Sequence, residues 1–283
     1  MIHTALLLGD LPPAWSGIAW VAGWLCTVGS LAVIGTVLLG KPAVLWFLAT
    51  LRGAAPPLPE PSALSVSLIT VGRDAADLME AKTRNSLATR LPGGRLQVVL
   101  FSDGPEADGG SRLHALAAAH PRVDYGCTPR RVGKNAALNE AVAICTGDIL
   151  VFSDADALLA PDALARLLRP LADPRVGGVC GRRVIAEEAG ALRSAQQEYI
   201  DFDSRLKTWE NRIGGLTAND GKLYAVRRDL FEPIPDGVTD DLYTCLTVAL
   251  RGRRFAFAPH AVARIRTPSR SIRHELTRRR RVV

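Results

Sequence analysis

The sequence predicts an α/β domain with a mostly parallel sheet flanked by helices, preceded by one N-terminal transmembrane helix. Three observations lead to this prediction. Thirty uncharged residues stand near the N-terminus, strand-like and helix-like stretches alternate after residue 64, and aspartates follow two of the expected strands. With 283 residues, 48% of them apolar, the chain can bury a sizeable core.

The N-terminal helix is expected within residues 11–40, which carry no charge. A bilayer core of ~30 Å is spanned by about 20 apolar residues in a helix. Lys41 follows this stretch and Asp10 precedes it, so the positive-inside rule places the C-terminal side in the cytoplasm. We therefore expect a single-pass anchor in the inner (plasma) membrane over residues 1–52, and a Pro-rich linker over residues 53–64.

Charge and composition limit the expected partners. The net charge is +7, but eight arginines lie between residues 264 and 281, and the rest of the chain is nearly neutral. No nucleic-acid recognition motif accompanies this Arg-rich segment over 264–283, so we expect membrane lipid and no nucleic acid as its partner. The five cysteines and five histidines form no CxxC, HxxxH or HExxH motif, so a His/Cys metal site is not expected.

Between the linker and the Arg-rich segment, strands are expected to alternate with helices, which is typical of βαβ units. In the helix expected at 74–91, Leu78, Ala81, Leu87 and Leu91 fall near one face. The expected strands cover 64–71, 95–103, 122–126, 148–156 and 175–186, and the other expected helices cover 111–121, 134–147, 160–171 and 191–215.

Aspartates stand at the ends of two expected strands, where open α/β sheets bind ligands. Asp103 ends "VVLFSD", and Asp154 and Asp156 end "ILVFSDAD". Two carboxylates facing a crevice suit a divalent cation that shares its remaining ligands with a diphosphate. From these residues alone an acidic turn or helix cap is an equal alternative. A third is an aspartyl-nucleophile phosphatase using Asp154, because "DADAL" nearly meets its DxDx[TV] motif.

Four blocks in order resemble the family 2 glycosyltransferases, which include relatives of cellulose, chitin and hyaluronan synthases. The blocks are "VVLFSDG", "RRVGKNAALNEAV", "GDILVFSDADALLAPDAL" and "VTDDLYTCLTVALRGRRF". The last matches the family's Thr-Glu-Asp block, with Asp240 in place of the usual Glu. The resemblance implies a GT-A fold, here over residues 65–263. The C-terminal segment does not carry the Gln-x-x-Arg-Trp motif of processive members.

The resemblance also implies a role for each matching position. Asp103 contacts the nucleotide base or ribose, and Lys134 lies near the nucleotide. Asp154 and Asp156 bind the ribose, the diphosphate and Mg²⁺ or Mn²⁺. Asp240 belongs to the nucleotide-sugar site, and Asp241 is the general base that deprotonates the acceptor hydroxyl.

The expected function is therefore a membrane-anchored, inverting and metal-dependent glycosyltransferase. It moves a sugar from a nucleotide-diphosphate sugar, expected to be a UDP-sugar, to a hydroxyl of a saccharide or lipid acceptor, in polysaccharide or glycolipid biosynthesis. The alternatives within the same fold are a retaining glycosyltransferase and a polyprenyl-phosphate glycosyltransferase. The phosphatase and a membrane-tethered binding protein are the alternatives of other classes. The sequence does not name the donor sugar, the acceptor or a partner subunit.

Overall fold

The computed structural model describes residues 13–53, 64–91, 93–105, 109–186 and 191–265. The chain divides into two compact units, Met1–Gly53 and Ala54–Val283. Most of the Pro-rich linker, and the Arg-rich segment beyond Ile265, lie outside the described residues.

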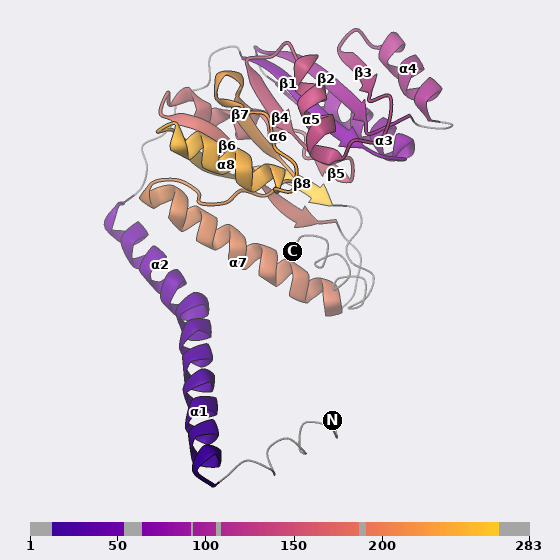
Figure 1. The fold of residues 1–283 in the computed structure, drawn as a ribbon. Coiled ribbons are helices and arrows are strands. Elements are labelled where there is room, and N and C mark those ends of the chain that lie inside the picture. The colour runs from indigo at the N-terminus through magenta and orange to yellow at the C-terminus, as the bar shows by residue number, and fades with distance from the viewer. Residues whose placement is uncertain (1–12, 54–63, 92, 106–108, 187–190, 266–283) are drawn as a thin grey trace. The chain divides into compact units, whose positions relative to one another are not determined.

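The N-terminal unit is one helical run. It consists of α1 (Pro13–Gly35), a π-helical turn η1 (Thr36–Gly40) and α2 (Lys41–Leu51) (Figure 1). Within the described residues, the stretch Gly17–Leu51 is the one helix long and apolar enough to cross a membrane. Its large apolar side chains, such as Trp20 at 71% exposure, are uncovered within the unit.

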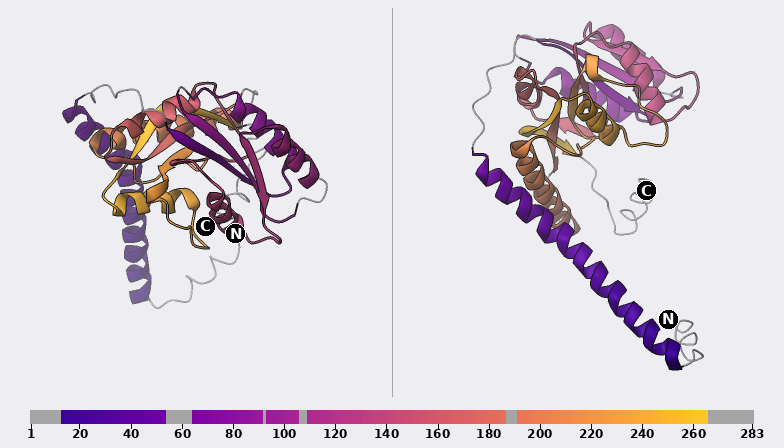
Figure 2. Two further views of the ribbon diagram at one scale, coloured as in Figure 1. Left: turned by 90° about the horizontal axis from the view of Figure 1, so that it is seen from above. Right: turned by 60° about the vertical axis from the view of Figure 1, so that its left-hand side comes forward.

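The second unit is built on one mixed sheet (Figures 1 and 2). In the described part of the chain, eight strands follow the order β3-β2-β1-β4-β7-β6-β8-β5. The pairs β1·β2, β2·β3, β1·β4 and β6·β8 are parallel, and β4·β7, β6·β7 and β5·β8 are antiparallel. The strands are β1 (Ser65–Gly72), β2 (Arg95–Ser102), β3 (Val123–Cys127), β4 (Ile149–Phe152), β5 (Ala157–Leu159), β6 (Val176–Ile185), β7 (Tyr224–Arg227) and β8 (Arg254–Ile265).

Helices cover both faces of the sheet. Side chains of α3, α4 and α6 belong to one hydrophobic core, and side chains of α5 and α8 belong to the other. The long helix α7 packs against β6 and β8. The helices are α3 (Ala76–Leu87), α4 (Gly110–Ala119), α5 (Lys134–Ala143), α6 (Ala163–Leu168), α7 (Ala191–Ile213) and α8 (Asp240–Leu250), with short 3₁₀ turns η2 (Arg169–Ala172) and η3 (Arg228–Leu230).

The two cores explain why the central strands carry apolar residues on both faces. Along β2, Val98 and Leu100 point to the first core, and Val99 and Phe101 point to the second. Because successive side chains of a strand alternate between its faces, a strand covered on both sides has no polar face.

Helix α3 differs from its sequence-based prediction. The expected apolar face forms only in part: Leu87 and Leu91 pack against the core, whereas Leu78 is 39% exposed. The buried face instead consists of Met79, Lys82, Thr83 and Ser86. The physical reason is that the Lys82 ammonium finds partners in the turn that follows β4, so this mostly polar face packs against the sheet.

Strand β4 is also shorter than predicted, and strand β7 was not expected. β4 ends at Phe152, and the chain turns through residues 153–156 before β5 begins. Strand β7 runs antiparallel to β4, with Tyr224 opposite Phe152. Residues that precede β7 therefore lie at the same edge of the sheet as the aspartates that follow β4.

Candidate functional site

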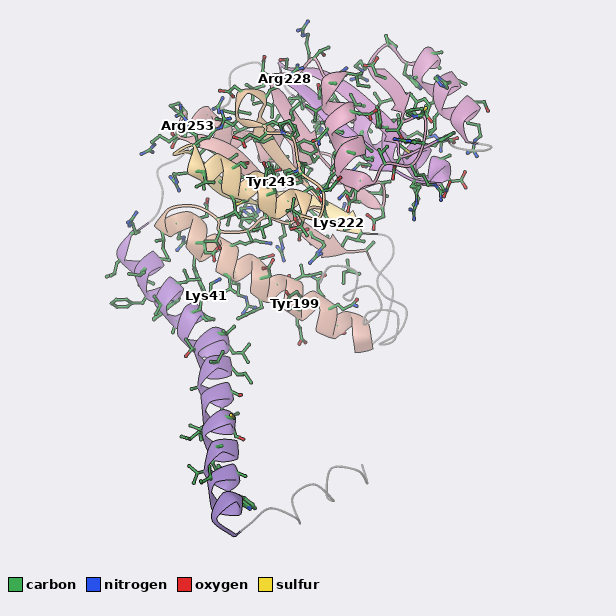
Figure 3. The ribbon with its side chains drawn as sticks, in the orientation of Figure 1. Lys41, Tyr199, Lys222, Arg228, Tyr243 and Arg253 are labelled. Carbon is green, nitrogen blue, oxygen red and sulfur yellow. The ribbon has the colours of Figure 1, made fainter. Side chains whose placement is uncertain are left out.

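The turn between β4 and β5 holds Asp154 and Asp156 around a lysine. The Nζ atom of Lys222 lies 2.8 Å from Asp154 Oδ2 and 2.8 Å from Asp156 Oδ1. Lys222, labelled in Figure 3, belongs to the segment just before β7. Two aspartates from one strand end and a lysine from another loop therefore meet at the predicted edge of the sheet.

Lys134 connects this pair of aspartates to a second pair. It is the first residue of α5, and its Nζ lies 3.4 Å from Asp154 Oδ1 and 3.1 Å from Asp240 Oδ1. Partial burial alone lowers the pKa of Lys134, but the carboxylates of Asp154 and Asp240 outweigh this effect and raise it. In the same way, burial raises the pKa of Asp154, but Lys134 and Lys222 hold it below its usual range.

Asp241 stands in the first turn of α8 and is held by backbone amides. The amide of Gly221 donates to its Oδ2 at 3.0 Å, and the amide of Leu242 donates to its Oδ1 at 2.8 Å. The side-chain Nδ2 of Asn219 donates to the backbone carbonyl of Asp241 at 2.8 Å. Burial, and then the neighbouring Asp240 carboxylate, raise the pKa of Asp241. A carboxylate with a raised pKa is suited to accept a proton.

Asp103 has a contact that the sequence did not indicate. It is buried at 7% exposure, and its Oδ1 accepts hydrogen bonds from the amides of Val132 at 2.7 Å and Gly133 at 3.2 Å. Its Oδ2 also lies 3.2 Å from the Gly133 amide. Gly133 has a φ of 95°, a left-handed conformation that favours glycine. Asp103 thus fixes the bend that places Lys134 at the start of α5.

A fully buried lysine lies beneath the turn of the two aspartates. Lys82 has no solvent-exposed surface, and its Nζ donates to Ser153 Oγ at 2.7 Å and to the Ala157 carbonyl. These contacts hold both ends of the turn. Burial lowers the pKa of Lys82 to about 7, although the charges of Asp154 and Asp156 act in the opposite direction.

The segment Asn219–Lys222 contacts both pairs of aspartates. Gly221 and Asn219 hold Asp241, and Lys222 holds Asp154 and Asp156. A small pocket opens between the pairs. It is lined by Ile69, Val71, Lys134, Leu138, Phe152, Ser153, Asp154, Gly221 and Asp240.

Tyr224, the first residue of β7, contacts two of the residues that line this pocket. Its ring is stacked on Phe152, with the ring centroids 4.8 Å apart, and its hydroxyl lies 3.3 Å from Asp240 Oδ2. Burial raises the pKa of Tyr224 well above its usual value, so this group is a neutral hydrogen-bond donor at Asp240.

Five of the six residues predicted from the sequence meet at this edge of the sheet. The sixth, Asp103, contacts the backbone amides that precede Lys134. The arrangement adds Lys82, Lys222 and Tyr224, which the sequence did not single out. Lys222 stands in "GLTANDGKL", a stretch for which no strand and no site residue was predicted. Among the described residues there is no cluster of three or more His, Cys, Asp or Glu side chains that could hold a metal ion.

A sequence model described as glycosyl transferase family 2 matches residues 81–234, more than half of the chain. The chain belongs to glycosyl transferase family 2. The matched range includes Asp103, Lys134, Asp154 and Asp156, and it ends before Asp240. Membership of this family decides against the aspartyl-nucleophile phosphatase and against a protein that only binds ligands.

Curated relatives of this family 2 glycosyl transferase carry the name N-acetylglucosaminyltransferase. The protein from Mesorhizobium japonicum (strain LMG 29417 / CECT 9101 / MAFF 303099) is 26% identical over 199 residues, which are 65% of this chain and 47% of the relative. The protein from Rhizobium sp. (strain N33) is 25% identical over 221 residues, 73% of this chain and 49% of the relative. The chain spans about half the length of these relatives.

Solved structures of glycosyltransferases share the fold. The mannosyltransferase PcManGT from Pyrobaculum calidifontis, in complex with GDP-Man and Mn²⁺, is 27% identical with a TM-score of 0.71, covering 88% of this chain and 71% of that chain. GalNAc-T7 with UDP, GalNAc and Mn²⁺ is 13% identical with a TM-score of 0.55, covering 72% of this chain and 43% of that chain. The second likeness concerns the fold alone. The predicted GT-A fold is confirmed.

Proposed function

We propose that this family 2 glycosyl transferase is an inverting enzyme that moves a sugar from a nucleotide-diphosphate sugar to the hydroxyl of a saccharide or lipid acceptor. The observation that carries the proposal is the pairing of acids at one sheet edge. Asp154 and Asp156 form one pair, Asp240 and Asp241 form the other, and Lys134 lies between them. An inverting displacement needs a base on one side of the anomeric carbon and stabilisation of the leaving diphosphate on the other.

Asp241 is the proposed base. Each of its carboxylate oxygens accepts one backbone amide, which fixes the group and leaves further lone pairs for an acceptor hydroxyl. As the acceptor oxygen attacks the anomeric carbon, its proton passes to Asp241. The bond between that carbon and the diphosphate oxygen breaks, and its electron pair leaves with the diphosphate. Attack opposite to the leaving group inverts the configuration at the anomeric carbon.

Lys134 is proposed to face the leaving diphosphate. It lies at the N-terminus of α5, where the helix dipole favours an anion. Its ammonium already carries two carboxylate contacts, so it is oriented before the donor arrives. The Asp103 contact with the Gly133 amide keeps this helix start in place, and a direct contact of Asp103 with the nucleotide stays a prediction.

The two aspartates of the turn fit a divalent cation. Their carboxylates already converge on one cationic atom, Lys222 Nζ, at 2.8 Å each. Mg²⁺ and related ions in diphosphate sites commonly take one or two protein carboxylates and complete their shell with phosphate oxygens and water. Asp154 and Asp156 are the proposed holders of Mg²⁺ or Mn²⁺, which when bound neutralises charge on the leaving diphosphate.

The donor and the cellular place also belong to the proposal. The relatives are named N-acetylglucosaminyltransferases, which supports a UDP-sugar, whereas PcManGT was solved with GDP-Man. The apolar helix Gly17–Leu51 supports a membrane anchor. Lys41 follows the uncharged stretch in the sequence, so the positive-inside rule favours a catalytic unit on the cytoplasmic side.

The test is turnover of UDP-N-acetylglucosamine and GDP-mannose by the wild type, Asp156→Asn and Asp241→Asn, with Mn²⁺ present. We expect Asp241→Asn to reduce kcat by about 10²–10⁴-fold, the usual contribution of a positioned base, and to keep nucleotide binding. Asp156→Asn should lose metal-dependent nucleotide binding. The configuration of the product, read by NMR, should be inverted.

A matched control is Asp173→Asn. Asp173 is an ion-paired aspartate in the loop before β6, with its Oδ2 2.9 Å from Arg175. The Asp173→Asn variant should turn over the donor at the wild-type rate. Full activity in both site variants, or a product of retained configuration, would contradict the proposed roles.

A further inference from the structure

Lys222 occupies the position that a cation needs between the two aspartates. Its Nζ lies 2.8 Å from Asp154 Oδ2, and 2.8 Å and 3.1 Å from the two carboxylate oxygens of Asp156. The Lys222 side chain is 20% exposed and the aspartate side chains are about 30% exposed, at 31% and 28%. The ammonium is therefore partly withdrawn from water and lies against both carboxylates.

The backbone of Lys222 is fixed independently of its side chain. Its carbonyl accepts a hydrogen bond from Ser153 Oγ at 2.9 Å, and its amide donates to Asp220 Oδ1 at 3.2 Å. Ser153 in turn accepts a hydrogen bond from the buried Lys82 at 2.7 Å. Removal of the ammonium from the carboxylates thus requires only rotation of the Lys222 side chain, without movement of the loop.

An ammonium and a divalent cation cannot share this position. A divalent ion binds carboxylate oxygens at about 2.0–2.2 Å and takes the lone pairs that now point at Lys222 Nζ. The ion carries twice the charge, but Lys222 is part of the same chain and is always present at high effective concentration. Metal binding must therefore displace the Lys222 ammonium.

We propose that Lys222 is an internal counter-ion that competes with the divalent cation for Asp154 and Asp156, and so weakens metal binding to the free protein. The inference rests on the proposed metal site and adds to it a residue that sets its affinity. The pair of carboxylates keeps a cationic partner when no metal is bound, and Lys222 is released beside the diphosphate site when the metal arrives.

The test measures Mn²⁺ affinity without nucleotide, from the loss of the free Mn²⁺ signal in electron paramagnetic resonance, on the full chain. We expect Lys222→Met to bind Mn²⁺ about tenfold more tightly than the wild type, the order expected when one partly buried ammonium no longer competes. Lys222→Arg keeps the charge and should stay near the wild type. Mn²⁺ should also raise the Tm of Lys222→Met more than that of the wild type.

A gain of affinity separates competition from damage, because a distorted loop weakens a metal site. Lys207→Met is the matched control, since Lys207 is a lysine paired with Asp203 at 2.6 Å on α7, and it should not change Mn²⁺ affinity. If Lys222→Met does not fold, as judged by circular dichroism, Lys222→Gln replaces it.

The possible outcomes separate the inference from the proposed function. If Asp156→Asn loses Mn²⁺ binding while Lys222→Met matches or falls below the wild type, the inference is wrong and the metal site stands. If the wild type, Asp156→Asn and Lys222→Met all fail to bind Mn²⁺ at millimolar concentration, the proposed metal site is wrong and the inference falls with it.

Discussion

Asp240 and Asp241 are adjacent in the sequence but have different surroundings. Asp240 contacts Lys134 and Tyr224, whereas Asp241 is held by the backbone amides of Gly221 and Leu242. Within the described residues, Asp240 therefore has a cationic partner, and no ion pair is found for Asp241. Burial and the charge of Asp240 raise the pKa of Asp241, which favours Asp241 as the proton acceptor of the pair.

This difference predicts a pH effect. A base acts in its deprotonated form, so kcat/KM should fall as the pH drops through the raised pKa of Asp241. Asp240→Asn removes one of the charges that raise this pKa, and the acid limb of the profile should move to lower pH. The measurement is kcat/KM against pH for both proteins, with Asp173→Asn as control. A limb that stays in place or moves to higher pH contradicts the assignment.

Lys82 predicts a pH dependence of stability. Burial lowers its pKa from the usual 10.5 to about 7 in the folded protein. Between about pH 7 and pH 10.5 the unfolded chain therefore binds more protons at this group than the folded chain does. The contribution of Lys82 to the free energy of unfolding thus rises with pH over this window.

The measurement is urea denaturation of the wild type and Lys82→Met between about pH 7 and pH 9. The free energy of unfolding of Lys82→Met should rise less with pH than that of the wild type. Lys207→Met serves as the control, because the pKa of Lys207 is raised and not lowered. Burial lowers this pKa, but Cys180, Asp220 and Asp203 act in the opposite direction and outweigh burial. Identical slopes for the wild type and Lys82→Met would show that Lys82 keeps its proton throughout.

At the scale of elements, β6 depends on glycines that allow close packing. Gly178 pairs with Val226 of β7 on one side and Phe255 of β8 on the other. A Cβ atom at Gly178 would lie 2.3 Å from Phe255 Cε2 and 2.6 Å from its Cδ2. The ring of Phe255 therefore occupies the space that any side chain at position 178 would need.

Gly178→Ala should accordingly lower the free energy of unfolding by about 1–3 kcal/mol, as overpacking of a core does. Urea denaturation measures the change. Gly214→Ala is the matched control, because a Cβ there meets nothing within 4 Å. Equal stability of the two variants would mean that the Phe255 ring moves aside at no cost.

The elements that the sequence predicted are those with a strong local pattern. The buried strands β1 and β2 and the helix α5 follow apolar runs or helical spacing, and the aspartates at strand ends followed from the expected topology. Strand β7 has only four residues and joins β4 in the antiparallel direction, and a short apolar run does not reveal its direction. Lys222 was missed for this reason, since its place beside Asp156 depends on that pairing.

The buried face of α3 shows a second limit of prediction from the sequence. Apolar spacing placed Leu78 inward, whereas Lys82 is inward in the structure. A lysine is almost never fully buried without partners, and those partners, Ser153 and Ala157, are more than 70 positions away in the sequence. Only the folded arrangement shows them.

At the scale of the whole molecule, the chain has two units of different character. In Met1–Gly53 the apolar side chains are largely exposed, and in Ala54–Val283 they form two cores around the sheet. The described residues of the first unit belong to neither core, which is the basis for predicting that lipid surrounds this helix.

We therefore predict that the full chain fractionates with membranes and is released by detergent, but not by high salt. A chain that begins at Ala54 should stay folded and bind Mn²⁺ with the affinity of the full protein. We predict that any attraction of the Arg-rich segment to anionic lipid acts through charge and is removed by salt. Release of the full chain by salt alone would contradict a spanning helix.

The segment Asn219–Lys222 has a consequence for engineering this enzyme. Gly221 and Lys222 are consecutive, yet one holds the proposed base and the other holds the proposed metal ligands. Both residues lie in one turn that precedes β7, so one inserted residue here would displace both contacts together. Donor and acceptor preferences of this enzyme therefore cannot be exchanged separately through this loop, and a change of specificity has to keep its length.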